Sequence, residues 1–120
     1  MAGLNLNTTL FPYRTRLNEK NPMELTIELK NETNKAKMVS LSVKLPSVFA
    51  LDKTGLNKTD EKKIKSISPG ETKKIIYSIY SMNYAEAGVY SGKITVHDHF
   101  NNYDYLLGTI SKELVLKIIE

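Results

Sequence analysis

The sequence predicts an all-β fold in which two antiparallel sheets, with seven strands in total, pack as a sandwich. The main support is the alternation of apolar and polar residues over 24–30 and 39–45, which is the period-two pattern of half-buried strands. Turn-forming residues recur about every ten positions, as is typical of sandwiches built from short strands. No window keeps a helical period, so we do not expect an α/β fold.

Each strand is expected where this alternation lies between turn signals. The expected segments are residues 4–10, 24–30, 39–45, 64–67, 73–82, 90–96 and a last strand that covers 106–110 and 114–118. Pro46 ends the third strand, because proline cannot donate a hydrogen bond to a ladder. A short apolar piece at 48–51 follows, and residues 52–61 form a polar loop.

Two turns are predicted from residue types. Residues 31–35, Asn-Glu-Thr-Asn-Lys, supply the polar turn of an antiparallel hairpin that joins strands 24–30 and 39–45. Residues 68–71, Ser-Pro-Gly-Glu, place proline and glycine at the two central positions of a type II turn. The chain then reverses into strand 73–82.

Residues 86–92, Glu-Ala-Gly-Val-Tyr-Ser-Gly, carry the most specific motif in the chain. An acidic residue followed by Gly88 and Tyr90 ahead of a strand matches the tyrosine corner of immunoglobulin-like sandwiches. In that corner the glycine permits a tight entry, the tyrosine ring packs inward, and its hydroxyl bonds to backbone a few residues upstream. Gly92 stands where an antibody domain has its second cysteine. We therefore expect an immunoglobulin-like Greek-key sandwich without a disulfide.

The strand 25–31, the Leu-Pro pair at 45–46, the turn at 68–71 and the Gly-Val-Tyr at 88–90 together resemble archaeal and bacterial CARDB and NEW3-type domains. The resemblance covers about residues 22–97. It implies an extracellular, often tandem, adhesion or spacer module that binds through its surface. Major sperm protein and pilus-chaperone sandwiches, which are cytoplasmic or periplasmic scaffolds, share the same outline.

The chain departs from the family pattern in two places. One is the long lysine-rich loop before strand 64–67, and the other is the segment 98–104 after strand 90–96. Insertions in loops are where a function particular to one protein is expected.

Length and composition indicate a single domain over residues 1–120. A chain of 120 residues buries about two-thirds of the surface that it exposes when unfolded, so it needs no metal or disulfide to fold. It has no cysteine, which excludes disulfides, zinc–thiolate sites and thiol nucleophiles. No window has the ~18 consecutive apolar residues of a membrane helix, and residues 1–5 lack the regions of a signal peptide. We expect no membrane insertion by this segment.

The net charge of +4 comes from fifteen lysines and two arginines. Nucleic-acid readers usually use arginine, whose planar fork pairs with phosphate and guanine, so no nucleic-acid partner is expected. Several lysines gather near residues 58–74, namely Lys58, Lys62, Lys63, Lys65, Lys73 and Lys74. This cluster either meets polyanions or protects an edge strand from pairing with other chains.

No catalytic set can be assembled from the sequence. Residues 52–55, Asp-Lys-Thr-Gly, reproduce the phosphorylation tetrapeptide of P-type ATPases, but Leu56 and Asn57 replace the Thr-Leu that should follow. An Asp/Gly turn explains the same residues. No glycine-rich phosphate cradle or Ser-His-Asp grouping is present, so we expect neither an enzyme nor a cofactor.

His97 and His99 form the candidate metal site. They share one face if the strand continues past residue 96, and Asp104 would add an oxygen ligand across the hairpin. The alternative is a polar strand end, where His and Asp are common.

Three Asn-x-Thr sequons, at Asn7, Asn31 and Asn57, are candidate glycosylation sites that would all be reachable from solvent. Asn31 and Asn57 fall in expected turns. The alternative is that asparagine is simply frequent in the turns of this chain.

Two rows of apolar residues form the candidate interaction surface, Ile76 with Tyr80 and Val115 with Ile119. Rim strands of a sandwich also accept a strand from another chain. We therefore expect a non-catalytic interaction or adhesion module with a protein partner or a second copy of itself, belonging to an extracellular or cell-surface protein or assembly. A free-standing cytoplasmic scaffold and a metal-binding protein are the alternatives.

Overall fold

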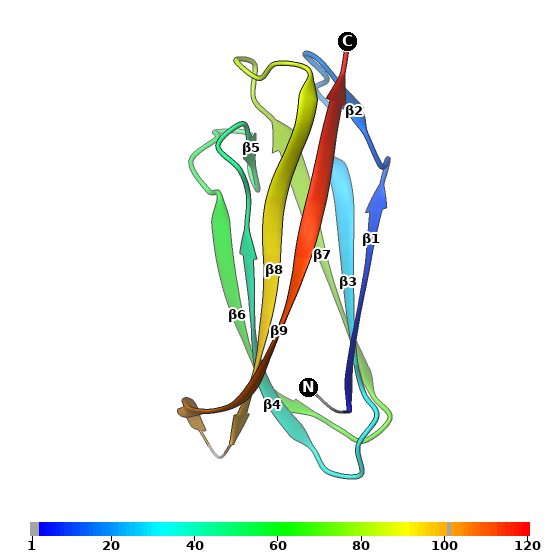
Figure 1. The fold of residues 1–120 in the computed structure, drawn as a ribbon, viewed down its shortest axis with the longest axis vertical. Coiled ribbons are helices and arrows are strands. Elements are labelled where there is room, and N and C mark those ends of the chain that lie inside the picture. Colours follow the sequence, from blue (N-terminus) through cyan, green and yellow to red (C-terminus); the bar gives the residue numbers. More distant parts are fainter. Residues whose placement is uncertain (1–2, 101) are drawn as a thin grey trace.

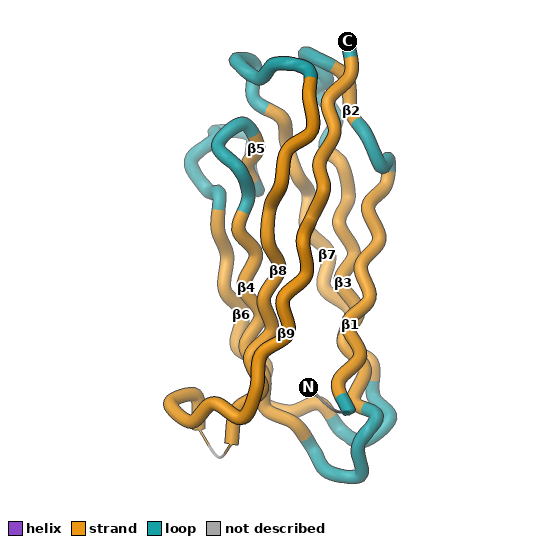
Figure 2. The backbone as a smooth tube through the Cα atoms, viewed as in Figure 1, coloured by secondary structure: helices purple, strands orange, loops and turns teal. Residues whose placement is uncertain are grey.

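The computed structural model describes residues 3–100 and 102–120, and the side chains of these residues except at 100 and 102–105. The described residues form two β-sheets joined by loops (Figures 1 and 2). The strands are β1 (Leu4–Phe11), β2 (Thr15–Arg16), β3 (Met23–Asn31), β4 (Lys37–Lys44), β5 (Phe49–Ala50), β6 (Thr59–Ile67), β7 (Thr72–Ser81), β8 (Gly88–Phe100) and β9 (Asn102–Ile119).

One sheet has four strands in the order β1-β3-β7-β5, and the other has five in the order β2-β9-β8-β4-β6. Neighbouring strands are antiparallel except for β2, which runs parallel to the end of β9. The body of the molecule is elongated along the strands, with extents of 48 × 24 × 19 Å. The all-β class and the two-sheet architecture predicted from the alternation are confirmed.

The core lies between the two sheets and is made by every second residue of each long strand. Leu25, Ile27 and Leu29 of β3 are fully buried, and the intervening residues point to the outer face of the sheet. Val39 and Leu41 of β4 meet them from the other layer. The alternation in the sequence therefore identifies the buried face of these strands correctly, because side chains in a strand repeat every two residues.

The predicted count of seven strands is wrong, since the described residues contain nine. The additional strands, β2 and β5, have two residues each. Two residues cannot display an alternation, so no sequence pattern marks them. They are strands because tertiary packing lays them beside longer ones: Thr15 lies opposite Ile118, and Phe49 lies opposite Ser81.

The predicted hairpin between strands 24–30 and 39–45 is also wrong. β3 pairs with β1 and β7, whereas β4 pairs with β6 and β8 in the other sheet. Residues 31–36 therefore cross from one layer to the other. Asn31 makes this possible, because its buried side chain bonds to the loop and to the opposite sheet instead of forming an exposed turn.

Another crossing between the sheets is the turn at residues 68–71, which leads from β6 to β7. Gly70 has a φ of 77°, and the Glu71 amide donates to the Ser68 carbonyl at 2.9 Å. These features confirm the predicted type II turn, which needs a residue with positive φ at its third position. The Glu71 carboxylate accepts a further bond from the Ser68 amide at 2.8 Å.

β8 and β9 are longer than the sequence predicted. β8 continues to Phe100, and the two expected pieces of the last strand are one strand, Asn102–Ile119. Figure 1 shows their hairpin leaving the sandwich at the end opposite the C-terminus. The pairing slips near its end, where Asp98 lies opposite Gly108 and His99 lies opposite Leu106. In the part of the chain that is described, no helix is long and apolar enough to span a membrane.

Candidate functional site

The tyrosine corner has the geometry that its motif requires. Tyr90 Oη donates a hydrogen bond to the Glu86 carbonyl at 2.6 Å. The Tyr90 ring meets Phe49 edge to face, with centroids 5.8 Å apart and planes at 75°. The corner therefore ties the loop before β8 to β5, and its role is structural.

Gly92 is required by a close approach of two strands. A Cβ atom added here would lie 2.7 Å from the Lys44 carbonyl oxygen and 3.5 Å from Cδ of Pro46. The space that an antibody domain gives to its disulfide is thus filled by the backbone where β4 ends. The absence of cysteine is compatible with this packing, because there is no room for a sulfur.

Of the three sequons, Asn31 is buried, with 0% of its surface exposed. Its Nδ2 donates to the carbonyls of Lys35 and Ile67 at 2.7 and 2.8 Å, and its Oδ1 accepts from the Thr33 amide and hydroxyl at 2.9 and 2.6 Å. A glycan would have to replace one of the two Nδ2 bonds. The expectation that Asn31 is reachable from solvent is therefore wrong, whereas Asn7 and Asn57 are exposed.

The Asp52 loop is a closed hydrogen-bonded turn. One carboxylate oxygen of Asp52 accepts from Thr54 Oγ1 at 2.9 Å and from the Gly55 amide at 3.0 Å, and the other accepts from Asn57 Nδ2. Desolvation raises the pKa of Asp52, but the bonds from Thr54, Asn57 and Gly55 together lower it below its ordinary value. Both oxygens are used inside the turn, which favours the structural interpretation of this tetrapeptide over phosphoryl transfer.

His97 and His99 lie on the outer face of the five-stranded sheet, with ring centroids 6.2 Å apart. His97 Nδ1 is 3.0 Å from Thr109 Oγ1, and His99 Nε2 is 2.8 Å from Ser40 Oγ. The side chain of Asp104 lies outside the described residues. Among the described residues, no three His, Asp or Glu side chains gather as a metal-binding group.

Asp98 is a buried charged group that sequence reasoning missed. Its side chain is 4% exposed, and Oδ2 pairs with Lys37 Nζ at 3.1 Å. Oδ1 is buried and receives no hydrogen bond from any described residue. The signal was present in the sequence, because Asp98 continues the inward-facing row of Ile94 and Val96.

The four predicted interaction residues do not form one surface. Ile76 and Tyr80 lie on β7, with Ile76 52% exposed. Val115 and Ile119 lie on β9 in the other sheet, with Val115 51% exposed. The two rows are therefore on different layers of the sandwich, and one partner surface could cover only one of them.

The lysine cluster is largely engaged with the protein itself. Lys58 Nζ donates to the carbonyls of Ser47 and Phe49 at 2.6 and 3.1 Å. Lys62 lies 3.8 Å from Asp60, and Lys73 lies 3.3 Å from Glu71. Lys62, Lys63 and Lys65 belong to β6, which is the outer strand of its sheet. This placement agrees with charge that blocks an edge from pairing.

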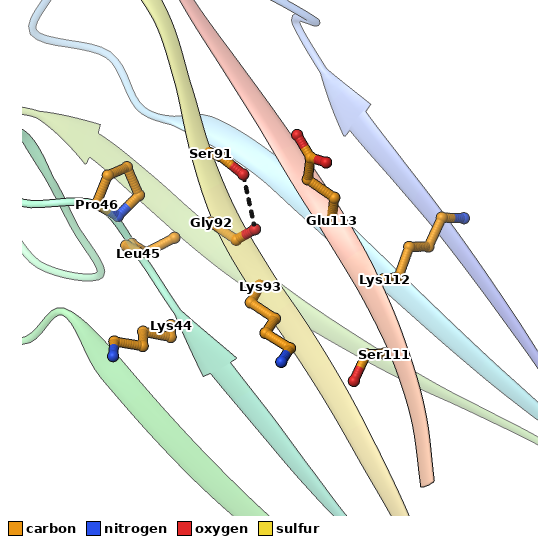
Figure 3. A pocket seen from close by; sticks show the side chains of 9 residues that line it. All are labelled: Lys44, Leu45, Pro46, Ser91, Gly92, Lys93, Ser111, Lys112 and Glu113. Atoms are coloured by element: carbon orange, nitrogen blue, oxygen red, sulfur yellow. Dashed lines mark hydrogen bonds between the residues drawn. The ribbon is translucent and has the colours of Figure 1, made fainter.

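A depression of about 440 Å³ lies on the five-stranded sheet where β4 leaves β8. Three lysines, Lys44, Lys93 and Lys112, contribute to its lining, together with Glu113. Figure 3 shows that their amino groups point in different directions instead of converging. The depression therefore offers no common point at which the three charges could hold an anion.

The edge of β9 that faces away from β8 is open to pairing over much of its length. β9 pairs with β8 along nearly its whole length, but on its other side β2 covers only Ile118 and Ile119. The backbone of residues 106–117 thus has one side without a described neighbouring strand. Three of the apolar residues along it, Leu106, Leu107 and Val115, are more than half exposed.

The chain is similar to known proteins in its structure but not in its sequence. No protein-family model and no curated protein sequence matches the chain. The chain is similar in structure to BcpA, the major pilin subunit of Bacillus cereus, with a TM-score of 0.72 and 8% identity over 96% of this chain and 40% of the pilin. This chain thus spans less than half of that protein.

Two smaller proteins are covered more completely. A CARDB domain from Pyrococcus furiosus, in complex with di-metal ions, has a TM-score of 0.61 and 14% identity over 97% of this chain and 87% of the domain. Self-complemented MyfA, the major subunit of Myf fimbriae from Yersinia enterocolitica, has a TM-score of 0.56 and 9% identity over 97% and 99%. Identities this low establish the fold alone. The chain thus has the fold of a CARDB-type immunoglobulin-like domain, as the sequence motifs predicted.

Proposed function

We propose that this chain is a non-catalytic protein-interaction module of a surface protein or surface assembly, and that it binds through its strand edges. The observation that carries the proposal is the uneven protection of these edges. β6 carries five charged residues within Thr59–Ile67, whereas β1 and residues 106–111 of β9 carry none. Uncharged edges accept strands from other chains, and charged edges reject them.

The kinds of protein that share the fold support an assembly role. BcpA and MyfA are pilin and fimbrial subunits, which are built to contact other protein chains. We propose a similar assembly role for this chain. The shared fold by itself is compatible with many functions.

The absence of catalysis is part of the same proposal. Asp52, which the sequence offered as a candidate nucleophile, is used inside its own turn, and the buried Asp98 is held in an ion pair with Lys37.

Fractionation of native cells with an antibody against this chain tests the proposal. A signal in the surface or membrane fraction is expected, and cross-linking there should give adducts with another protein. A signal confined to the cytoplasm would favour the alternative of a cytoplasmic scaffold. In surface material, glycans would be expected at Asn7 and Asn57, and mass spectrometry that finds both bare would remove glycosylation from the proposal.

Metal binding by His97 and His99 is a second candidate, favoured by two imidazoles 6.2 Å apart on one face. The structurally similar CARDB domain from Pyrococcus furiosus was solved in complex with di-metal ions, which supports this candidate. Asp104 is proposed as the third ligand. Zinc titration should give binding that is lost in His97→Ala and in Asp104→Ala, and a flat titration of the unchanged protein would exclude the site.

A further inference from the structure

The edge of β9 that faces away from β8 is long, uncharged over half its length and partly apolar. It comprises residues 106–117, whose backbone has β8 on one side, while β2 reaches only Ile118 and Ile119 on the other. Leu106 and Leu107 are 57% and 59% exposed. Unpaired donors and acceptors next to exposed apolar side chains are the conditions under which a sheet edge accepts another strand.

The same edge already accepts one strand within the molecule. Thr15 and Arg16 of β2 lie opposite Ile118 and Ile119, and the Leu17 amide donates to the Ile119 carbonyl at 2.9 Å. This side of β9 therefore faces a space that admits a paired strand, and an added strand would continue the line of β2 toward Leu106. Because β2 already pairs with Ile118 and Ile119, the added strand can pair only with residues of β9 that precede Ile118.

The sequence of this edge can pair with itself in an antiparallel register that places no like charges opposite each other. Two antiparallel strands related by a twofold axis perpendicular to the sheet place residues of the same face opposite each other. With Ser111 at the axis, Thr109 lies opposite Glu113 of the second copy, and Leu107 lies opposite Val115. The ladder then covers residues 107–115 and leaves Ile118 and Ile119 paired with β2.

Neighbouring registers are less favourable. An axis at Lys112 would place two ammonium groups opposite each other, and an axis at Glu113 would place two carboxylates opposite each other. An axis at Ile110 would bring Leu107 against Glu113. The register at Ser111 avoids like charges and covers two exposed apolar residues, Leu107 and Val115.

We infer that the partner of the β9 edge is a second copy of this chain, joined by antiparallel pairing of residues 107–115 about Ser111. The two five-stranded sheets thereby form one continuous sheet. This inference rests on the proposed function, because it names the partner for the edge that the proposed function uses.

Sedimentation velocity of the protein over a range of concentrations tests the pairing. The unchanged chain should pass from monomer to dimer as concentration rises. Ser111→Lys and Ser111→Glu each place two like charges directly opposite each other at the axis, so each should weaken dimerisation by up to about fivefold. A mixture of the two variants should form a heterodimer, because the charges at the axis are then opposite.

Ser78→Lys is the matched control. Ser78 is an exposed serine on the outer face of β7 in the other sheet, so the same change of charge there should leave the dimer unaffected. Circular dichroism checks that every variant is folded. Ser111 is exposed on β9, so its substitutions do not disturb the core.

Two results would overturn the pairing: a monomer at all concentrations, or charge variants whose mixture associates no better than either alone. Neither result bears on the surface location or the adducts with other proteins that test the proposed function. Conversely, a cytoplasmic chain that still dimerises through Ser111 would retain the pairing and lose the surface role.

Discussion

The side-chain amide of Asn31 donates a hydrogen bond of 2.8 Å to the main-chain carbonyl of Ile67, across 36 positions of sequence and from one sheet to the other. The Asn31 backbone completes the link, because its amide donates to the Glu71 carbonyl and its carbonyl accepts from the Gly70 amide. Two of the crossings between the sheets, at 31–36 and 68–71, are thus held together by one residue.

Replacing Asn31 by alanine should destabilise the protein by about 2–3 kcal/mol. The change leaves the buried carbonyl of Ile67 without its donor and the Thr33 amide without its acceptor. Urea denaturation measures the loss. Asn34→Ala, at an exposed position of the same loop, is the control and should change stability by less than about 0.5 kcal/mol. Equal effects of the two changes would show that the Asn31 bonds contribute nothing.

Removing the hydroxyl of Tyr90 should lower the free energy of unfolding by about 1 kcal/mol. Tyr90→Phe keeps the ring contact with Phe49 and loses only the bond to the Glu86 carbonyl. Tyr84→Phe is a matched change, because Tyr84 Oη also donates to a carbonyl, that of Ser47 at 2.7 Å, from a side chain that is 61% exposed. Thermal unfolding should show a larger loss for Tyr90, and the reverse order would contradict a structural corner.

Tyr77 links stability to alkaline pH. Burial raises the pKa of Tyr77 strongly above 10.0, and the hydrogen bond to Asp60 and the charge of its carboxylate raise it further. Because the pKa of Tyr77 is higher in the folded state, the stability that its hydroxyl contributes is fully present below pH 10. This stability is lost as the pH rises toward the pKa of the folded state. The difference in unfolding free energy between the unchanged protein and Tyr77→Phe should therefore be constant near neutral pH and shrink above pH 10. A difference that does not depend on pH would contradict this linkage.

The coupling energy between Tyr77 and Asp60 can be measured at neutral pH. A double-mutant cycle with Tyr77→Phe and Asp60→Ala should give a coupling of about 1 kcal/mol, since the phenol oxygen and the carboxyl oxygen are 2.7 Å apart. Solvent access to Asp60, whose side chain is 38% exposed, keeps the value small.

Adding one methyl group at Gly92 should destabilise the fold by about 1–3 kcal/mol. In Gly92→Ala the new Cβ meets the Lys44 carbonyl oxygen at 2.7 Å, so β4 has to move away from β8. Ser91→Ala, one residue earlier and exposed, is the control and should be nearly neutral. Guanidinium denaturation compares the two, and a stable Gly92→Ala would show that the strands separate here at little cost.

The candidate site was only partly accessible to sequence reasoning. The alternation placed His97 and His99 on one face, and the strand does continue through them. Asp98 was overlooked because charged residues are seldom buried, although its position in the inward row marked it. Asn31 was read as an exposed turn residue, because nothing local distinguishes a turn within one sheet from a crossing between two.

By itself, the sequence determined the all-β class, the buried faces of β3 and β4, the turn at 68–71 and the corner at Tyr90. These features depend on side-chain periodicity and on the backbone preferences of glycine and proline, which act over a few residues. Only the tertiary structure decided which sheet each strand joins, the pairing of β2 and β5, and the open edge at 106–117. Every backbone carries the same donors and acceptors, so the choice of neighbouring strand is made by packing between residues far apart in the chain.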